Sequence, residues 1–250
     1  MIEYKYREAF VCKKGEFMSK RLSRKLAVLA AGLFLCCMFF VGRETASFVL
    51  GRNVEENRIC VVIDAGHGGD DPGKVGVNDA KEKDINLEIT LLLKQFLEAA
   101  DVDVVLTRVD EEGLYDADAS NKKVQDMKRR VEILSKEQPK LTVSIHQNSY
   151  PEEYVKGAQV FYYTGSVEGQ ALAQCIQNQL IQRVDPANTR QIKANDSYYL
   201  LKKAEGPIVI AECGFLSNWE EAEKLCTVEY QEKIAWAIHL GILQYLNASH

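Results

Sequence analysis

The hydrophobic positions of the chain fall into short continuous runs, and segments of helical periodicity separate these runs. Because a strand with apolar side chains at successive positions must be buried on both faces, the runs predict strands inside a covered sheet. The five runs occupy residues 59–64, 102–107, 141–145, 158–163 and 208–211. Continuous rather than alternating apolar strands are typical of a mostly parallel sheet.

Helical patterns lie between the predicted strands. In the clearest one, apolar residues recur at steps of three and four from Ile85 to Leu97, and Asp84 is placed to cap the first turn. The other patterns cover about residues 122–136, 167–183 and 230–246. Strands that alternate with helices predict a single α/β domain, with a mostly parallel central sheet that helices cover on both faces. A chain of 250 residues accommodates such a domain behind an N-terminal appendage.

An uninterrupted apolar run covers residues 26–41 and predicts a membrane-insertion signal. Cationic side chains within residues 20–25 precede it, and such a flank stays in the cytoplasm while the following chain is exported. The run is intermediate in length between a signal-peptide core and a membrane span of about 20 residues, so residues 26–42 fit either a signal peptide or a signal anchor. A retained anchor is the favoured interpretation, because the candidate cleavage site around Ala46 is weak.

This interpretation divides the chain into four parts. Residues 1–25 form a cytoplasmic segment, for which Met18 is an alternative initiator, and residues 26–42 form the signal anchor or signal peptide. The polar residues 43–57 form a linker, and residues 58–250 form the globular domain. The globular domain is therefore expected outside the cytoplasm, either anchored to the membrane or secreted.

Charge and cysteine content exclude several classes of function. The formal net charge is -5 and the isoelectric point is about 5.5, so there is no overall basic field to gather nucleic acid, and we expect no nucleic-acid partner. The seven cysteines are odd in number and scattered, so they predict neither a disulfide framework nor a structural zinc knuckle. Cys60 and Cys213 fall in buried-strand patterns, where a thiol behaves as a small apolar side chain.

Reactive side chains follow the predicted strands. In open α/β sheets, ligands bind beyond the carboxyl ends of the strands, where several loops meet. His67 follows the first strand, His146 ends the third, and Glu212 ends the last. Glu82 lies just ahead of the helix that is expected to begin near Asp84. Glycines beside His67 would let the backbone approach a ligand closely.

Two histidines and a carboxylate with one open position form a catalytic zinc set, and a further carboxylate can serve as general base. Each residue also has a structural interpretation. A histidine after a strand is commonly a hydrogen-bonding residue, and Glu82 could stabilise a helix N-terminus. Glu212 is harder to explain in this way, because an unpaired buried carboxylate is costly. The residue pattern alone leaves the metal site and the structural interpretation equally open.

Other candidate chemistry has less support. His239 falls within the last helical pattern and His250 is terminal, so we expect structural or solvent-exposed roles for both. Ser144 and Cys213 lack the G-x-S-x-G or Cys-His setting of a serine or cysteine hydrolase.

Ordered motifs resemble the zinc-dependent N-acetylmuramoyl-L-alanine amidases of the Amidase_3 family, over about residues 59–246. The matching segments are residues 62–73 (VIDAGHGGDDPG), 81–87 (KEKDINL), 106–108 (LTR), 144–149 (SIHQNS) and 208–218 (IVIAECGFLSN). The resemblance implies hydrolysis of the amide bond between N-acetylmuramic acid and L-alanine in peptidoglycan. It also implies that residues 58–250 are a zinc amidase catalytic domain.

By this resemblance, His67, Glu82 and His146 would bind Zn²⁺, and Glu212 would be the catalytic glutamate. Arg130 matches a family arginine with a structural or substrate role, and Asn148 would help to shape the site. Gln147 departs from the family pattern, because a small or apolar residue is commoner after the second histidine. This departure bears on the shape of the neighbouring subsite.

The absence of a wall-binding repeat or of a long insert is a second departure. A bare catalytic domain behind an anchor looks like the germination-specific amidases of the family, which implies action on spore cortex before a deacetylase forms muramic-δ-lactam. The expected partners are glycan strands with stem peptides, the membrane and an accessory protein, and the forespore intermembrane space is an expected location. A vegetative cell-separation amidase is an alternative. So is a non-catalytic peptidoglycan-binding regulator, which would be expected to have lost a ligand or the catalytic glutamate.

Overall fold

The computed structural model describes residues 32–34, 36–38 and 59–248. Its globular part is built on a six-stranded sheet. Across the sheet the strands are β2 (Asp103–Leu106), β1 (Cys60–Ala65), β3 (Leu141–Asn148), β6 (Ile208–Phe215), β4 (Gln159–Tyr163) and β5 (Lys193–Asn195). Strands β2, β1, β3 and β6 are parallel, whereas β4 is antiparallel to β6 and carries β5 in parallel on its other edge. The mostly parallel sheet confirms the predicted α/β class.

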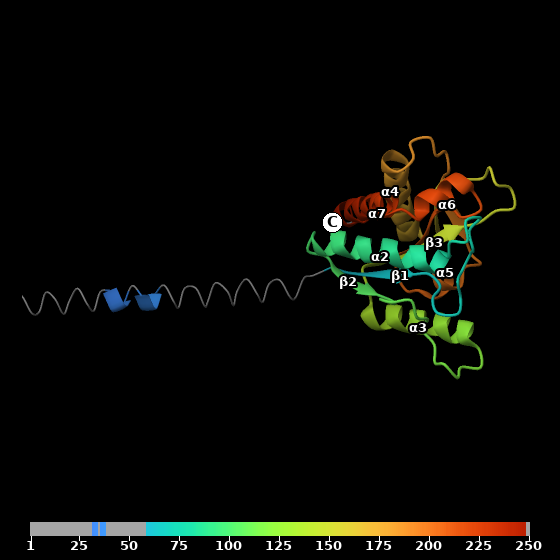
Figure 1. The fold of residues 1–250 in the computed structure, drawn as a ribbon. Helices are drawn as coiled ribbons and strands as arrows, with labels where there is room; N and C mark the ends of the chain where they lie inside the picture. The colour runs from blue at the N-terminus through green and yellow to red at the C-terminus, as the bar shows by residue number, and fades with distance from the viewer. Residues whose placement is uncertain (1–31, 35, 39–58, 249–250) are drawn as a thin grey trace, which may run out of the picture. The chain divides into compact units, whose positions relative to one another are not determined.

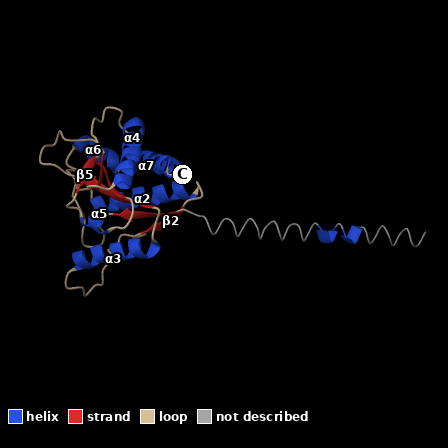
Figure 2. Ribbon diagram, turned by 180° about the vertical axis from the view of Figure 1, so that it is seen from behind, coloured by secondary structure: helices blue, strands red, loops and turns tan. Residues whose placement is uncertain are grey.

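Helices cover both faces of the sheet, as predicted (Figures 1 and 2). On one side lie α2 (Glu82–Glu98), α4 (Val167–Arg183) and α7 (Val228–Ala248), and α6 (Trp219–Leu225) joins them after β6. On the other side lie α3 (Lys122–Glu137) and the short α5 (Tyr199–Lys203). The continuous apolar strands follow from this layering: Ile63 of β1 packs into the larger core, and its neighbour Val62 packs into the smaller one.

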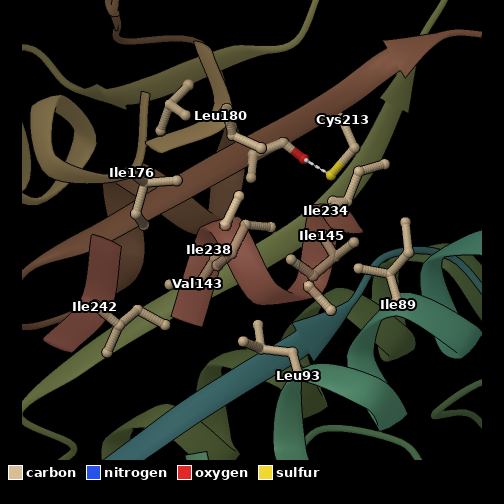
Figure 3. Packing of buried hydrophobic residues seen from close by; sticks show 14 of the residues in the cluster. Ile89, Leu93, Val143, Ile145, Ile176, Leu180, Cys213, Ile234, Ile238 and Ile242 are labelled. Carbon is tan, nitrogen blue, oxygen red and sulfur yellow. Dashed lines mark hydrogen bonds between the residues drawn. The ribbon is translucent and has the colours of Figure 1, made fainter. Parts of the chain in front are cut away.

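The larger core lies between β3 and the helices α2, α4 and α7. Figure 3 shows Leu93, Ile176 and Ile238 from the three helices around Val143 and Ile145 of β3, and all five side chains are fully buried. Close packing of this kind fixes where each strand ends relative to its neighbours. The core therefore holds the carboxyl edge of β1, β3 and β6 in one arrangement.

The element boundaries differ from the sequence prediction at places that concern the site. Strands β3 and β6 continue to Asn148 and Phe215, so His146 and Glu212 lie inside paired strands, directly opposite each other. Backbone pairing continues although the apolar run has ended. The short elements β5, α5 and α6 were not predicted, because three to seven residues are too few to show a periodicity.

The predicted capping role of Asp84 is wrong. Helix α2 begins at Glu82, with Lys81 at the N-cap position and without a side-chain cap. Carbonyl oxygens of the preceding loop take the place of the cap. The backbone N–H of Glu82 donates to Lys74 O at 2.9 Å, and that of Lys83 donates to Pro72 O at 3.1 Å.

The predicted N-terminal parts, residues 1–25, 26–42 and 43–57, lie almost entirely outside the described residues, and so does His250. Within the part of the chain that is described, no helix combines the length and the apolar character that crossing a membrane requires. The six cysteines in that part are free thiols, and Cys213 is fully buried as predicted. His239 is buried in α7, consistent with the structural role expected for it.

Candidate metal and catalytic site

Two buried arginines hold the loop that follows β1. Arg108 donates to the carbonyl oxygens of Ala65 and Gly66 at 3.0 and 3.2 Å. Arg130 donates to those of Ala65 and His67 at 2.7 and 2.6 Å. These bonds fix His67 in the left-handed region, at φ 65°, which a non-glycine residue rarely adopts.

Three of the predicted site residues converge at the carboxyl edge of the sheet. Glu82 Oε1 lies 3.2 Å from His67 Nε2 and 2.9 Å from His146 Nδ1. One possible ligand atom from each of the three side chains lies within 4.8 Å of the others. Glu82 is only 1% exposed, so it closes the inner end of the cluster.

The electrostatics of the cluster favour an ionised glutamate. Burial alone would raise the pKa of Glu82, but hydrogen bonding and attraction to His146 and His67 outweigh burial and hold that pKa well below its ordinary value. Two backbone donors hold the carboxylate in place: the Gln147 N–H reaches Oε1 at 3.0 Å, and the Lys74 N–H reaches Oε2 at 2.7 Å. Glu82 is therefore a preorganised anion between two imidazoles.

The surroundings leave room for the cluster only because two neighbours are glycines. A Cβ atom at Gly66 would lie 2.3 Å from Cε1 of His146. One at Gly73 would lie 2.5 Å from Oε2 of Glu82 and 2.6 Å from Cδ2 of His67. Two imidazoles and one carboxylate are a common donor set of catalytic zinc sites, and these three side chains could hold such an ion.

Asp71 is a site residue that the sequence reasoning missed. Its Oδ2 lies 3.0 Å from His67 Nδ1, and its Oδ1 accepts from the backbone N–H of Gly73 at 3.1 Å. A carboxylate on the outer nitrogen of a histidine fixes the ring and directs the other nitrogen inward, here toward Glu82. The sequence signal that could have identified Asp71 is its place in the first motif, four residues after His67.

Glu212 occupies the neighbouring position on β6 and is 7% exposed. Its Oε1 accepts a hydrogen bond from the Tyr198 hydroxyl at 3.4 Å. Its Oε2 is buried without a partner among the described residues. Burial, and secondarily the negative charge of Glu82, raises the pKa of Glu212. A carboxylate of this kind can accept a proton readily.

A cavity of about 420 Å³ opens onto this cluster. His67, His146 and Glu212 line it, whereas Glu82 lies behind the two histidines. The opposite walls come from the first half of α3, with Lys122, Lys123 and Met127, and from Tyr198 and Tyr199 at the start of α5. The cavity therefore exposes both imidazoles and the Glu212 carboxylate to one bound molecule.

The remaining predicted residues surround the site. Arg130 is buried between Asp64 and Asp126, bonds both carboxylates as well as the His67 loop, and also lines the cavity. Asn148 ends β3 and accepts from the backbone N–H of Ser149 at 2.8 Å, but it does not line the cavity. Gln147 does not shape a subsite there either, because alternation along β3 directs it to the opposite face, where it is 2% exposed.

Comparison with known proteins gives a consistent picture. Residues 61–244 match the model of the Amidase_3 family, described as N-acetylmuramoyl-L-alanine amidase. The germination-specific N-acetylmuramoyl-L-alanine amidase of Bacillus subtilis (strain 168) is 35% identical over 188 residues, which cover 74% of this chain and 78% of that protein.

Solved structures extend the likeness to the fold. The CwlD amidase from Clostridioides difficile, determined in complex with the GerS lipoprotein, is 42% identical with a TM-score of 0.75, and the match covers 76% of this chain and 100% of that one. The N-acetylmuramoyl-L-alanine amidase from Clostridium difficile 630 is 30% identical with a TM-score of 0.69, covering 78% of this chain and 100% of that one.

Proposed function

The chain belongs to the Amidase_3 family of N-acetylmuramoyl-L-alanine amidases, and from this premise we propose that it is a zinc-dependent hydrolase of spore-cortex peptidoglycan. The bond cleaved joins the lactyl carbonyl of N-acetylmuramic acid to the nitrogen of L-alanine. The observation that carries the proposal is the convergence of His67, Glu82 and His146 beside a cavity that the two histidines and Glu212 line.

In the proposed mechanism, His67, Glu82 and His146 would hold the zinc ion. Zinc, when bound there, would polarise the scissile carbonyl and lower the pKa of an attacking water to about 7. Asp71 keeps the His67 ring oriented, and the backbone N–H groups of Gln147 and Lys74 keep Glu82 in place. These contacts preorganise the site before the substrate arrives.

Glu212 moves the proton in this scheme. Its unpartnered Oε2 takes a proton from the attacking water and later delivers it to the leaving nitrogen of L-alanine. The carbonyl–nitrogen bond breaks, and the products are a muramic carboxylate and a peptide with a free amine. The raised pKa of Glu212 suits a group that must hold the proton between the two steps.

The likeness to a germination-specific amidase supports the spore cortex as the place of action. We extend the proposal to an extracytoplasmic domain that residues 26–42 tether to the membrane, supported by the apolar run behind its cationic flank. Because the similar CwlD amidase was solved with the GerS lipoprotein, we also propose an accessory lipoprotein partner for this chain.

Metal analysis beside mass spectrometry of released muropeptides tests the chemical proposal on the purified full-length protein. His146→Ala should lose both zinc and activity, because one histidine and one carboxylate are too few ligands. Glu212→Gln keeps the size of the side chain but removes the base, so zinc should stay near one equivalent while the rate falls by about 10²- to 10⁴-fold. Loss of zinc from Glu212→Gln would make that residue a ligand and refute the assignment of roles.

Gene deletion in the spore-forming host tests the biological part. Muramic-δ-lactam should disappear from the cortex while vegetative cells separate normally. Chained vegetative cells with a normal cortex would instead support the cell-separation alternative. Protease added to cells with permeabilised walls should digest the globular domain, and full protection would refute the extracytoplasmic location.

A further inference from the structure

A buried polar relay lies behind the candidate metal cluster, on the side away from the cavity. Its members are Gln147 of β3 and Asn86 of α2, which are 2% and 0% exposed. The Gln147 amide Nε2 donates to Asn86 Oδ1 at 3.2 Å. The Asn86 amide Nδ2 in turn donates to Glu82 Oε1 at 3.4 Å and to Gly66 O at 3.1 Å.

The direction of these hydrogen bonds decides which end of Asn86 faces Glu82. An asparagine amide offers one carbonyl oxygen and one NH₂ group, and only the NH₂ group can stabilise a carboxylate. Because Gln147 donates to the carbonyl oxygen, the NH₂ group is left to face Glu82 and Gly66. Without that donor, Asn86 Oδ1 would be a buried acceptor without its partner, and only the bonds from Nδ2 to Gly66 and Glu82 would orient the amide.

Packing does not explain a polar side chain at position 147. The Gln147 Oε1 atom is buried without a hydrogen-bond partner among the described residues, and such an atom costs about 1–3 kcal/mol. An apolar side chain of the same length would avoid this cost. The side chain also interacts with the Cys213 thiol, and the bond that it donates to Asn86 is its link to the metal cluster.

We propose that Gln147 and Asn86 are positioning residues, which hold the Glu82 carboxylate in the orientation that binds the metal ion. The inference rests on the proposed function, because it takes Glu82 as a metal ligand. The relay acts beside the backbone N–H of Gln147, which donates to the same Oε1 atom and remains in any side-chain variant. It also ties Glu82 to the His67 loop through the shared bond to Gly66.

The test measures zinc affinity and stability separately, on metal-free full-length protein. Gln147→Met keeps the length of the side chain and removes the donor. Its affinity for zinc, measured by competition with a chromogenic chelator, should fall by about 10-fold, the lower end of the effect of losing a direct partner of a ligand, because Gln147 acts through Asn86. Its free energy of unfolding without metal should change little, because the substitution removes the unpartnered Oε1 atom but leaves Asn86 Oδ1 as a buried acceptor without its donor.

Thr90→Val is the matched control. Thr90 lies one turn beyond Asn86 on α2, is fully buried, and its Oγ1 also has no partner among the described residues. The substitution removes a buried polar atom near the relay without touching it, so zinc affinity should not change. Gln147→Leu provides a second variant in case the methionine packs poorly.

Wild-type zinc affinity in both Gln147 variants would overturn the inference. So would an affinity loss that only accompanies an equal loss of stability, or an equal affinity loss in Thr90→Val, because each would indicate a general packing effect. A wild-type protein that binds no zinc would refute the metal site itself, and with it the basis of this inference.

Discussion

Gly66→Ala tests whether the position of His146 controls the site. The backbone of Gly66 is not in the left-handed region, so alanine introduces no conformational strain there. The added Cβ atom would lie 2.3, 2.4 and 2.7 Å from Cε1, Nε2 and Nδ1 of His146. Because carbon atoms pack at about 3.5–4.0 Å, the imidazole must withdraw by roughly 1 Å.

A displacement of this size should act mainly on function. Misplacement of a catalytic group by about 1 Å can lower the rate by about 10²-fold, whereas overpacking by one methyl group costs about 1–3 kcal/mol. The 2.9 Å contact between His146 and Glu82 would also be lost, so we expect weaker zinc binding and a kcat/KM about 10²-fold lower, in a folded protein. Chelator competition, a muropeptide assay and thermal unfolding measure the three quantities.

Gly165→Ala is the control for a general effect of replacing glycine. Gly165 has φ +85°, and no heavy atom lies within 4 Å of the position that an added Cβ atom would take, so alanine strains the backbone but meets nothing. It should lower stability by about 1 kcal/mol and leave zinc affinity unchanged. Wild-type zinc affinity and activity in Gly66→Ala would show that His146 moves without consequence and would refute the reasoning.

Three further predictions concern the groups around the site. Arg130→Met leaves Asp64 and Asp126 buried without their cation, so urea unfolding should show a loss of about 3–5 kcal/mol. Asp71→Asn weakens the hold on the His67 ring, and zinc affinity should fall by about 10- to 100-fold with little change in unfolding. Although burial opposes ionisation, attraction to Arg130 and hydrogen bonds from Ser144 and Thr107 lower the pKa of Asp64 to about 2. The stability from this ionised group is therefore complete above about pH 4 and lost as pH falls toward 2, so the advantage of wild type over Asp64→Asn should shrink in that window when unfolding is followed at several pH values.

The parts of the fold that the sequence predicted are those with a strong local signal. Continuous apolar runs indicated five of the six strands. Because these runs are continuous rather than alternating, they also implied a parallel sheet that is covered on both faces. The hydrophobic pattern did not indicate strand direction, because β4 is as apolar as its neighbours but runs antiparallel to β6. The extension of β3 past Ile145 was also hidden, because backbone hydrogen bonds continue the pairing through polar side chains.

The sequence could predict which residues meet at the candidate site, because strand topology alone brings them together. Parallel strands bring their carboxyl ends to one edge, so residues at or just after the ends of different strands meet there, as His67, His146 and Glu212 do. The contacts that orient these groups were not predictable, because they depend on side-chain direction. Gln147 adjoins a site histidine in sequence and yet points to the other face, where it meets Asn86.

Two arginines that are distant in sequence, Arg108 and Arg130, hold the backbone of the loop around His67. The left-handed conformation of His67 costs about 1–3 kcal/mol and persists only where its surroundings enforce it. Arg108 and Arg130 enforce it through carbonyl oxygens, whereas Asp71 and Glu82 hold the imidazole. Because separate groups hold the backbone and the ring, loss of the Arg130 bonds should release the loop, and loss of Asp71 should release only the ring. Arg130→Met should therefore lower both stability and zinc affinity, whereas Asp71→Asn should lower zinc affinity alone.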